Sequence, residues 1–507
     1  MKTTFYANGL AALLALTACG DDGDGGGEGA GDAGTAADDG TGTDDGGTGD
    51  DAGSDDVGDA DDDGSGDDSN ADVPEIYEFE SRFGDGSSVS HGGQTTRHLL
   101  IAELKDFIGG LDDAAYVGAA AGDVVADLNF WYDFKNNGGE AGEPILFAPS
   151  GAELLQTTFG EVGSVASVKE KIADIESVAA WEGGVAGWGD GSTAPSALVD
   201  IWFEELEALV LARSNDANIP TNPDGQDIAE PYVTAEGIDY QQLIQKFLLG
   251  AVAFSQAADK YMDDDKDGQG LLSDNTMAKD DKPYSALEHV WDEGYGYFGG
   301  ARDYVDYTDD DIADNGFADT DGDSKIDLKK EICWGASVNA AKRDRGATAG
   351  TDFTKDAFDA FLLGRHLIAT AGGDLSEAQL DELKGYRDTA LGAWEKAIAA
   401  TIVHYINDTL KDMGAFGSGD YSFADHAKHF SEMKGFALSL QFNKNHSPMS
   451  PADLAELHQL IRDRPVLPGA SDIEAYAADL NAAKDILQST YDFDAANMGD
   501  ADGNDGW

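Results

Sequence analysis

Residues 240–254 read YQQLIQKFLLGAVAF, and this stretch decides what kind of fold the chain can form. Its apolar residues repeat at spacings of three and four positions, which places them along one side of an α-helix. The members of this stripe are Leu243, Ile244, Phe247, Leu248, Ala251 and Val252. The pattern predicts an amphipathic helix that buries one face in a core.

Similar apolar stripes recur along the chain and are separated by clusters of Gly, Pro and Asp. They occupy residues 99–108, 198–211, 353–368, 391–406 and 473–487. The alternation typical of β-strands is scarce, and its best example, residues 87–90, is short. The sequence therefore predicts an all-α fold of about ten helices, packed into one or two helical bundles.

The first 19 residues have the features of a bacterial export signal. Lys2 precedes a short apolar run over residues 10–16, and the sequence LTAC that ends at Cys19 fits the cleavage motif of lipoproteins. We expect the leader to be removed and Cys19 to carry a lipid anchor; an ordinary signal peptide is the alternative. Because Gly20 and not an aspartate follows the cysteine, we expect the cell envelope, at the outer membrane of a Gram-negative bacterium.

Residues 20–73 form a segment of low complexity with 20 acidic residues, 17 glycines and no lysine or arginine. Such a segment cannot bury enough apolar surface to offset its ordering entropy, so we predict a disordered linker. The helical domain is then expected over residues 74–507, as one bundle or two bundle-like halves. The whole chain has a formal net charge of -67, which excludes most modes of nucleic-acid binding because phosphates are repelled.

Two acidic loops have the spacing of a calcium-binding loop. The first carries Asp263, Asp265 and Asp267 at positions one, three and five, a glycine at six and Asp274 at twelve. Ca²⁺ takes six to eight oxygen ligands, and the glycine permits the sharp turn between them. Because Asp274 is shorter than the glutamate usual at position twelve, we expect weak binding, and a solvated acidic loop is the alternative.

The second loop carries Asp319, Asp321 and Asp323 at the same first three positions. Lys325 occupies position seven, which supplies a backbone oxygen in such loops, and Asp327 supplies an oxygen at position nine. An isoleucine stands at position eight, where a merely solvated acidic run has no reason to place one. A serine replaces the usual glycine, and the glutamate falls one residue beyond position twelve. The pattern predicts a Ca²⁺ ion that organises the ends of helices.

Two helical segments combine histidine with carboxylates at the spacing of metal ligands. In the first, His289, Asp292 and Glu293 share one helical face, and in the second His429 and Glu432 form a His-x-x-Glu pair. Aligning the two glutamates also pairs neighbouring aromatic residues and glycines, as a degenerate internal duplication would. We expect these five residues to form a shared site for iron or another transition metal; histidines that hydrogen-bond within an aromatic core are the alternative.

No catalytic motif supports a specific enzyme activity. The sequence contains no HExxH, no G-x-S-x-G and no Walker loop, and the G-x-G-x-x-G of residues 294–299 does not follow an apolar strand. Cys333 lies in an apolar stretch and is expected in the core without a disulfide partner. A binding protein is therefore favoured over an enzyme.

Five stretches of the chain resemble bacterial lipoproteins of the domain-of-unknown-function family 4856. They are SSVSHGGQTTRHLLIAELKDFI (87–108), YSALEHVWDEGYGYFG (284–299), DTDGDSKIDLKKE (319–331), NAAKRDR (339–345) and HFSEMKGFALSLQFN (429–443). This resemblance spans most of the chain beyond the acidic linker and implies an architecture more than an activity.

A weaker similarity is to the imelysins, exported proteins with duplicated helical bundles and a G-x-H-x-x-E motif. His429 and Glu432 match the end of that motif, whereas Ala427 stands in place of its glycine. The similarity implies a link to iron uptake or to proteolysis.

Together these patterns favour a lipid-anchored helical protein that binds metal, with Ca²⁺ in the acidic loops and iron or a similar ion at the histidines. The enzyme alternative is a metallopeptidase in which Glu293 or Glu432 acts as general base on a metal-bound water. A third alternative is a structural or partner-binding surface protein in which calcium is only a staple. The sequence specifies neither a substrate nor a protein partner.

Overall fold

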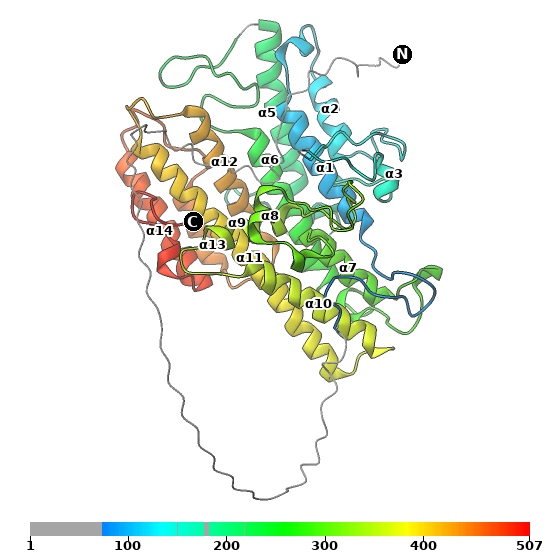
Figure 1. Cartoon of the computed structure of the whole chain (residues 1–507). Coiled ribbons are helices and arrows are strands. Elements are labelled where there is room, and N and C mark those ends of the chain that lie inside the picture. The colour runs from blue at the N-terminus through cyan, green and yellow to red at the C-terminus, as the bar shows by residue number, and fades with distance from the viewer. Residues whose placement is uncertain (1–72, 150, 177–180, 182, 217) are drawn as a thin grey trace, which may run out of the picture. The chain divides into compact units, whose positions relative to one another are not determined.

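The stretch that predicts a helix from residue 240 onward is helical without interruption to Tyr261 (Figure 1). Its first part, α6 (Tyr240–Leu248), begins at Asp239, whose carboxylate accepts a hydrogen bond from the backbone N–H of Gln242. The helix then widens into two π-helical segments, η4 (Leu249–Phe254) and η5 (Ala257–Tyr261). The predicted apolar stripe is buried along its length. The computed structural model describes residues 73–149, 151–176, 181, 183–216 and 218–507.

Helices dominate the described part of the chain, and the predicted all-α fold is confirmed. Apart from α6, the α-helices are α1 (Gly92–Gly109), α2 (Asp123–Tyr132), α3 (Phe159–Val162), α4 (Ala173–Glu176), α5 (Pro195–Asp216), α7 (Ala286–Phe298), α8 (Asp309–Asp314), α9 (Gly335–Gly346), α10 (Phe353–Ala371), α11 (Glu377–Gly414), α12 (Phe423–Ser439), α13 (Pro451–Ile461) and α14 (Ile473–Tyr491). Short 3₁₀ turns are η2 (Asp113–Tyr116), η3 (Lys169–Lys171), η6 (Gly270–Leu272), η7 (Lys279–Asp281), η8 (Tyr304–Asp306), η9 (Leu440–Phe442) and η10 (Ala495–Asn497). The number exceeds ten because α3, α4 and α8 are too short for an apolar repeat to reveal them.

The longest helix, α11, has 38 residues and lies beside α10 and α12 (Figure 1). It starts with a capping box, in which the side chains of Ser376 and Gln379 bind each other's backbone N–H groups. In turn α12 packs on α6, α6 on α1, and α1 on α7. Helices from early and late parts of the described sequence therefore share one core, which contains the fully buried Trp202, Trp291 and Trp394.

Two glycines permit close contacts of α7 and α12 with other elements. A Cβ atom on Gly296 of α7 would lie 2.5 Å from the Cβ of His91, just before α1. A Cβ atom on Gly435 of α12 would lie 2.6 Å from the Cβ of Lys246 in α6. These are the two glycines that pair when Glu293 is aligned with Glu432, so they serve the same packing purpose.

Other expectations from the sequence have mixed outcomes. Cys333 is buried and free, as predicted, and burial raises the pKa of its thiol to about 12. Residues 87–90 contribute only one isolated bridge, between Glu80 and Ser87. The predicted leader, Cys19 and the linker up to residue 72 lie outside the described residues. None of the described helices has the length and apolarity to cross a membrane.

Candidate functional site

A cleft of about 1130 Å³ is bordered by the start of α1, one face of α7 and the loop after α8. Its lining is polar and contains both cationic and carboxylate side chains. His289 and Glu293 line it from α7, and Asp321 and Asp327 line it from the loop. Residues from both kinds of predicted metal site therefore border the same cleft.

The opposite face of α7 is fixed in the core by a buried ion-pair network. The carboxylate of Asp292 is fully buried and accepts hydrogen bonds from the Tyr77 hydroxyl, the Ser90 backbone N–H and the Arg365 guanidinium. Burial raises the pKa of Asp292, and the charge of Arg365 opposes that rise. Asp292 thus anchors the helix and does not line the cleft, although the charge of the nearby His289 acts on it.

His289 and Glu293 are adjacent at the cleft. The distance between His289 Nε2 and Glu293 Oε2 is 3.6 Å, and each side chain is 17% exposed. Glu293 Oε1 accepts a hydrogen bond of 2.9 Å from the amide of Gln94, and the ring of Tyr284 stacks on the imidazole. The buried Nδ1 atom of His289 has no hydrogen-bond partner among the described residues. Tyr261, at the end of η5, also lines the cleft and interacts with Glu293.

A second histidine, His91, lines the same cleft and was not among the predicted ligands. It is 7% exposed, and its Nε2 atom has no hydrogen-bond partner within the described part of the chain. Burial, together with the nearby charge of Arg302, lowers its pKa to about 3. The imidazole is therefore neutral at pH 7 and could bind a metal without losing a proton. The ligand atoms of His91, His289 and Glu293 do not all lie within 4.8 Å of one another, so one ion held by all three requires a side-chain rotation.

The loop of residues 319–331 brings together the three carboxylates that its spacing predicts. Oxygen atoms of Asp319, Asp321 and Asp323 lie within 4.8 Å of one another, and all three side chains are exposed. Asp319 accepts hydrogen bonds from two backbone N–H groups of the loop, one of them at Ser324. Ser324, which replaces the usual glycine, has a φ of 69°, so the loop turns through the left-handed conformation despite the substitution.

The second half of this loop is anchored in the protein. Ile326 is 2% exposed, so it is buried as expected. Its backbone also pairs with that of Leu154 in an isolated bridge. The carboxylate of Asp327 accepts hydrogen bonds from Gln156 and from the Lys329 backbone.

Glu331 and Lys325 also hold the loop in place. The buried Glu331 accepts hydrogen bonds from the backbone N–H groups of Thr320 and Asp327, so it joins the two ends of the loop. Lys325 donates its backbone N–H to Asp323, and its ammonium lies 3.4 Å from Glu153.

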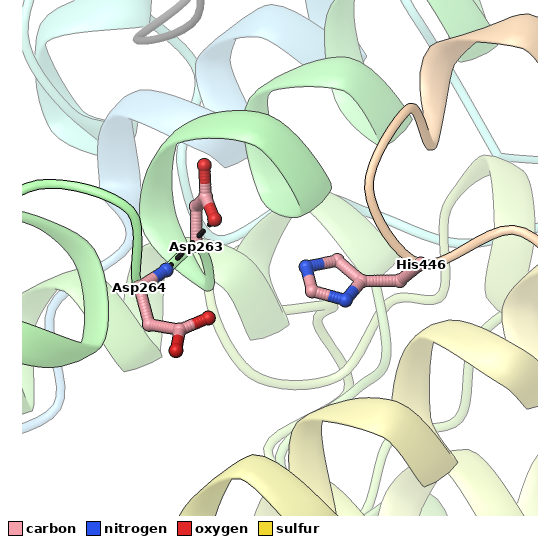
Figure 2. A group of neighbouring side chains, drawn as sticks. All are labelled: Asp263, Asp264 and His446. Carbon is pink, nitrogen blue, oxygen red and sulfur yellow. Dashed lines mark hydrogen bonds between the residues drawn. The ribbon is translucent and has the colours of Figure 1, made fainter.

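The first acidic loop is arranged differently from the prediction. Asp263 is buried, and its ligand atoms lie within 4.8 Å of those of Asp264 and His446 (Figure 2). Asp265, Asp267 and Asp274 are exposed, and no three of the four predicted ligands form such a group among the described residues. The carboxylate of Asp274 instead accepts hydrogen bonds from the neighbouring Thr276.

The His-x-x-Glu pair of α12 lies in other surroundings than the pair of α7. His429 Nδ1 lies 2.9 Å from Asp412 Oδ2 of α11. Glu432 is fully buried, 3.1 Å from the ammonium of Lys246. Neither residue lines the cleft, and their described contacts do not include His289 or Glu293. The five predicted ligands are therefore distributed over three places.

The charge state of His429 predicts a pH dependence of stability. Burial alone would lower its pKa, but Asp412, Asp408 and Glu432 outweigh burial and raise the pKa to about 9. A histidine whose folded pKa exceeds its unfolded value of about 6.5 stabilises fully below that value and loses the effect as pH rises through 9. We expect the stability difference between wild type and His429→Gln to be large at pH 6 and to vanish by pH 9.5.

Urea unfolding of both proteins at several pH values measures this difference. A difference that is constant from pH 6 to 9.5 would show that His429 is not charged in the folded protein.

Sequence reasoning missed His91, Gln94, Tyr261, Glu331 and His446. His91 and Gln94 belong to a stretch that resembles the family, but their helix is far from α7 in sequence. Glu331 was noted as the glutamate just beyond position twelve of the calcium-loop pattern. Its role as an acceptor of backbone hydrogen bonds could not be predicted, because it depends on how the loop folds. His446 carries no motif that relates it to Asp263.

Fold and site together define an all-helical protein with a polar cleft that is bordered by an acidic loop and a histidine–glutamate pair. Residues 192–486 match the family described as Domain of unknown function (DUF4856), and the chain belongs to that family. The match includes both acidic loops, α7 and α12, whereas His91 precedes it. No curated protein and no solved structure matches the chain.

Proposed function

We propose that this protein binds metal ions, with Ca²⁺ in the 319–327 loop and a transition-metal ion in the cleft. The observation that carries the proposal is the clustering of Asp319, Asp321 and Asp323, whose oxygens lie within 4.8 Å of one another. Hard cations such as Ca²⁺ prefer oxygen ligands of this kind. The same loop borders the cleft, so the ion would stiffen one wall of it.

The charge balance of the loop supports a cation. Asp319, Asp321 and Asp323 are three carboxylates on five consecutive residues, and like charges at this spacing repel each other unless a cation neutralises them. Two ammonium groups of residues 319–331 have other partners: that of Lys325 lies 3.4 Å from Glu153, and that of Lys329 donates to the backbone carbonyl of Glu161. The buried Ile326 and Glu331 anchor the backbone of the loop.

Calcium titration by calorimetry tests this part of the proposal. Asp321→Asn/Asp323→Asn keeps an oxygen at each position for the loop hydrogen bonds and removes two charges. We expect the wild-type chain to bind Ca²⁺ and the variant to bind it at least about tenfold more weakly, a loss of about 1.4 kcal/mol.

A matched control is Asp280→Asn/Asp281→Asn, which makes the same charge change at two exposed positions with positive φ. Equal calcium affinity of the two double variants would contradict a site in the loop.

The cleft is the second part of the proposal. Two histidines, His91 and His289, line it beside Glu293, and each has one ring nitrogen without a hydrogen-bond partner in the described structure. Imidazole nitrogens with one carboxylate suit iron, zinc and related ions better than Ca²⁺. The polar cleft leaves room for further ligands from water or from a small polar molecule that carries the metal.

Zn²⁺ binding by equilibrium dialysis at pH 7 tests the cleft. We expect His91→Ala/His289→Ala to lose one bound Zn²⁺ per chain, whereas His366→Ala, at a histidine that does not line the cleft, keeps it. The same Zn²⁺ content in both variants would remove the cleft from the proposal.

A further inference from the structure

A different group of ligand atoms lies where the long helix that starts at Tyr240 ends. Asp263 and Asp264 directly follow η5. His446 lies nearly 200 residues later in the chain, in the loop after α12 and η9. Figure 2 shows that its imidazole points toward the two aspartates. Oxygen and nitrogen atoms of these three residues all lie within 4.8 Å of one another. Asn445 also donates a hydrogen bond to Asp263.

The buried carboxylate of Asp259 adds an observation that is independent of this cluster. Asp259 is 1% exposed, and its Oδ1 atom has no hydrogen-bond partner among the described residues. A buried, unpartnered carboxylate oxygen is costly, so native proteins rarely leave one without a proton, a water or an ion. Apart from burial, the strongest influence on Asp259 is the charge of Asp263, so the two carboxylates are neighbours. It also accepts a hydrogen bond from the backbone of Lys444, two residues before His446, and the charges of Lys444 and Asp265 act on it as well.

The charges around the cluster leave an excess of acid. Two cations of α11, Lys384 and Arg387, each lie 2.7 Å from Asp264 and more than neutralise it. They leave lone pairs on its carboxylate, because each oxygen has two. With Lys444, three cations face the four carboxyl groups of Asp259, Asp263, Asp264 and Asp265. Asp263 interacts with the carboxyl group of Asp265, and such a contact requires a proton or a cation between the two groups.

His446 points to a kind of cation other than Ca²⁺. Its Nε2 atom is buried and has no hydrogen-bond partner in the described part of the chain. Its Nδ1 atom is 3.8 Å from Asp388, too far for a hydrogen bond, and that carboxylate pairs with Arg387 at 2.8 Å. A nitrogen ligand beside carboxylates is typical of Zn²⁺ and similar transition-metal ions, whereas Ca²⁺ takes oxygen ligands.

We propose that Asp263, Asp264 and His446 bind one divalent transition-metal ion, with Zn²⁺ as the reference ion, beside the buried carboxylate of Asp259. This site is separate from the cleft and from the 319–327 loop. The ion connects the end of η5 to the loop that follows α12. Tyr261, between Asp259 and Asp263 in sequence, lines the cleft and interacts with Glu293.

The test isolates this site from the other two. Zn²⁺ is titrated into the full chain carrying His91→Ala/His289→Ala, with excess Ca²⁺ present. We expect one Zn²⁺ to bind per chain in that background. Adding His446→Gln should weaken this binding at least about tenfold, since the loss of even an outer partner costs about 10–100-fold. His366→Gln in the same background is the control.

Two further measurements keep the test decisive. If His446→Gln lowers the melting temperature of the zinc-free protein, Asp263→Asn replaces it as the test variant. In the protein with an intact His446, Zn²⁺ should also shift the ¹⁵N resonances of that imidazole. Unchanged Zn²⁺ affinity in both variants, or no bound Zn²⁺ in the starting background, would overturn the inference. Neither result bears on calcium binding by the 319–327 loop.

Discussion

Replacing Arg365 by methionine should lower the free energy of unfolding by about 3–5 kcal/mol, the largest effect that we expect from a single substitution. The guanidinium is fully buried, donates to Asp292 at 2.8 Å and lies 3.3 Å from Glu288. It also donates to the Ser88 hydroxyl and lies over the ring of Phe79. Methionine fills much of the volume but leaves two buried carboxylates on α7 short of a partner.

Guanidinium chloride unfolding measures the change, and Lys355→Met provides the matched control. Lys355 pairs with Asp359 on the surface of α10, where both side chains are largely exposed, so its loss should cost no more than about 0.5 kcal/mol. If the two variants lose similar stability, the buried network does not fix α7. Since α7 carries His289 and Glu293, this network would then not hold that wall of the cleft in place.

Calcium should raise the stability of the protein by about 2.7 kcal/mol when its free concentration is 100 times the dissociation constant. This value applies to an ion that binds only the folded chain, in which the buried Ile326 and Glu331 anchor the loop that carries the three carboxylates. Unfolding is followed with and without a chelator. In Asp321→Asn/Asp323→Asn, with affinity at least about tenfold weaker, the gain at the same calcium concentration should fall to about 1.4 kcal/mol or less.

The comparison with Asp280→Asn/Asp281→Asn separates site binding from general screening of the acidic surface. Both double variants remove two charges, so a nonspecific effect of Ca²⁺ would decrease equally in both. A calcium effect that persists in the loop variant and equals that of the control would mean that the stabilisation does not come from this loop.

The helical fold could be predicted because its signal is local. The stripe of residues 240–254 repeats with the helical period, and its burial follows directly from that repeat. The helix count could not be predicted, since segments such as α3, with four residues, are too short to carry a period. The π-helical segments η4 and η5 also leave no distinct pattern, because they depend on packing against neighbouring helices.

The candidate sites were predictable only where the ligands are close in sequence. Asp319, Asp321 and Asp323 are brought together by one loop, and their spacing is enough to place them. The association of Asp263 with His446, and of His91 with His289, depends on tertiary packing between distant segments. Spacing alone also groups residues that have different partners: His289 lines the cleft, whereas Asp292 of the same helix binds Arg365 in the core.

Calcium content of the full-length protein, purified without chelator and measured by elemental analysis, tests the central claim most directly. The claim that the 319–327 loop is a cation site predicts near-stoichiometric calcium in the wild type and about one equivalent less in Asp321→Asn/Asp323→Asn. The claim would be contradicted if the purified wild-type protein contained no calcium and its melting temperature did not change when Ca²⁺ is added.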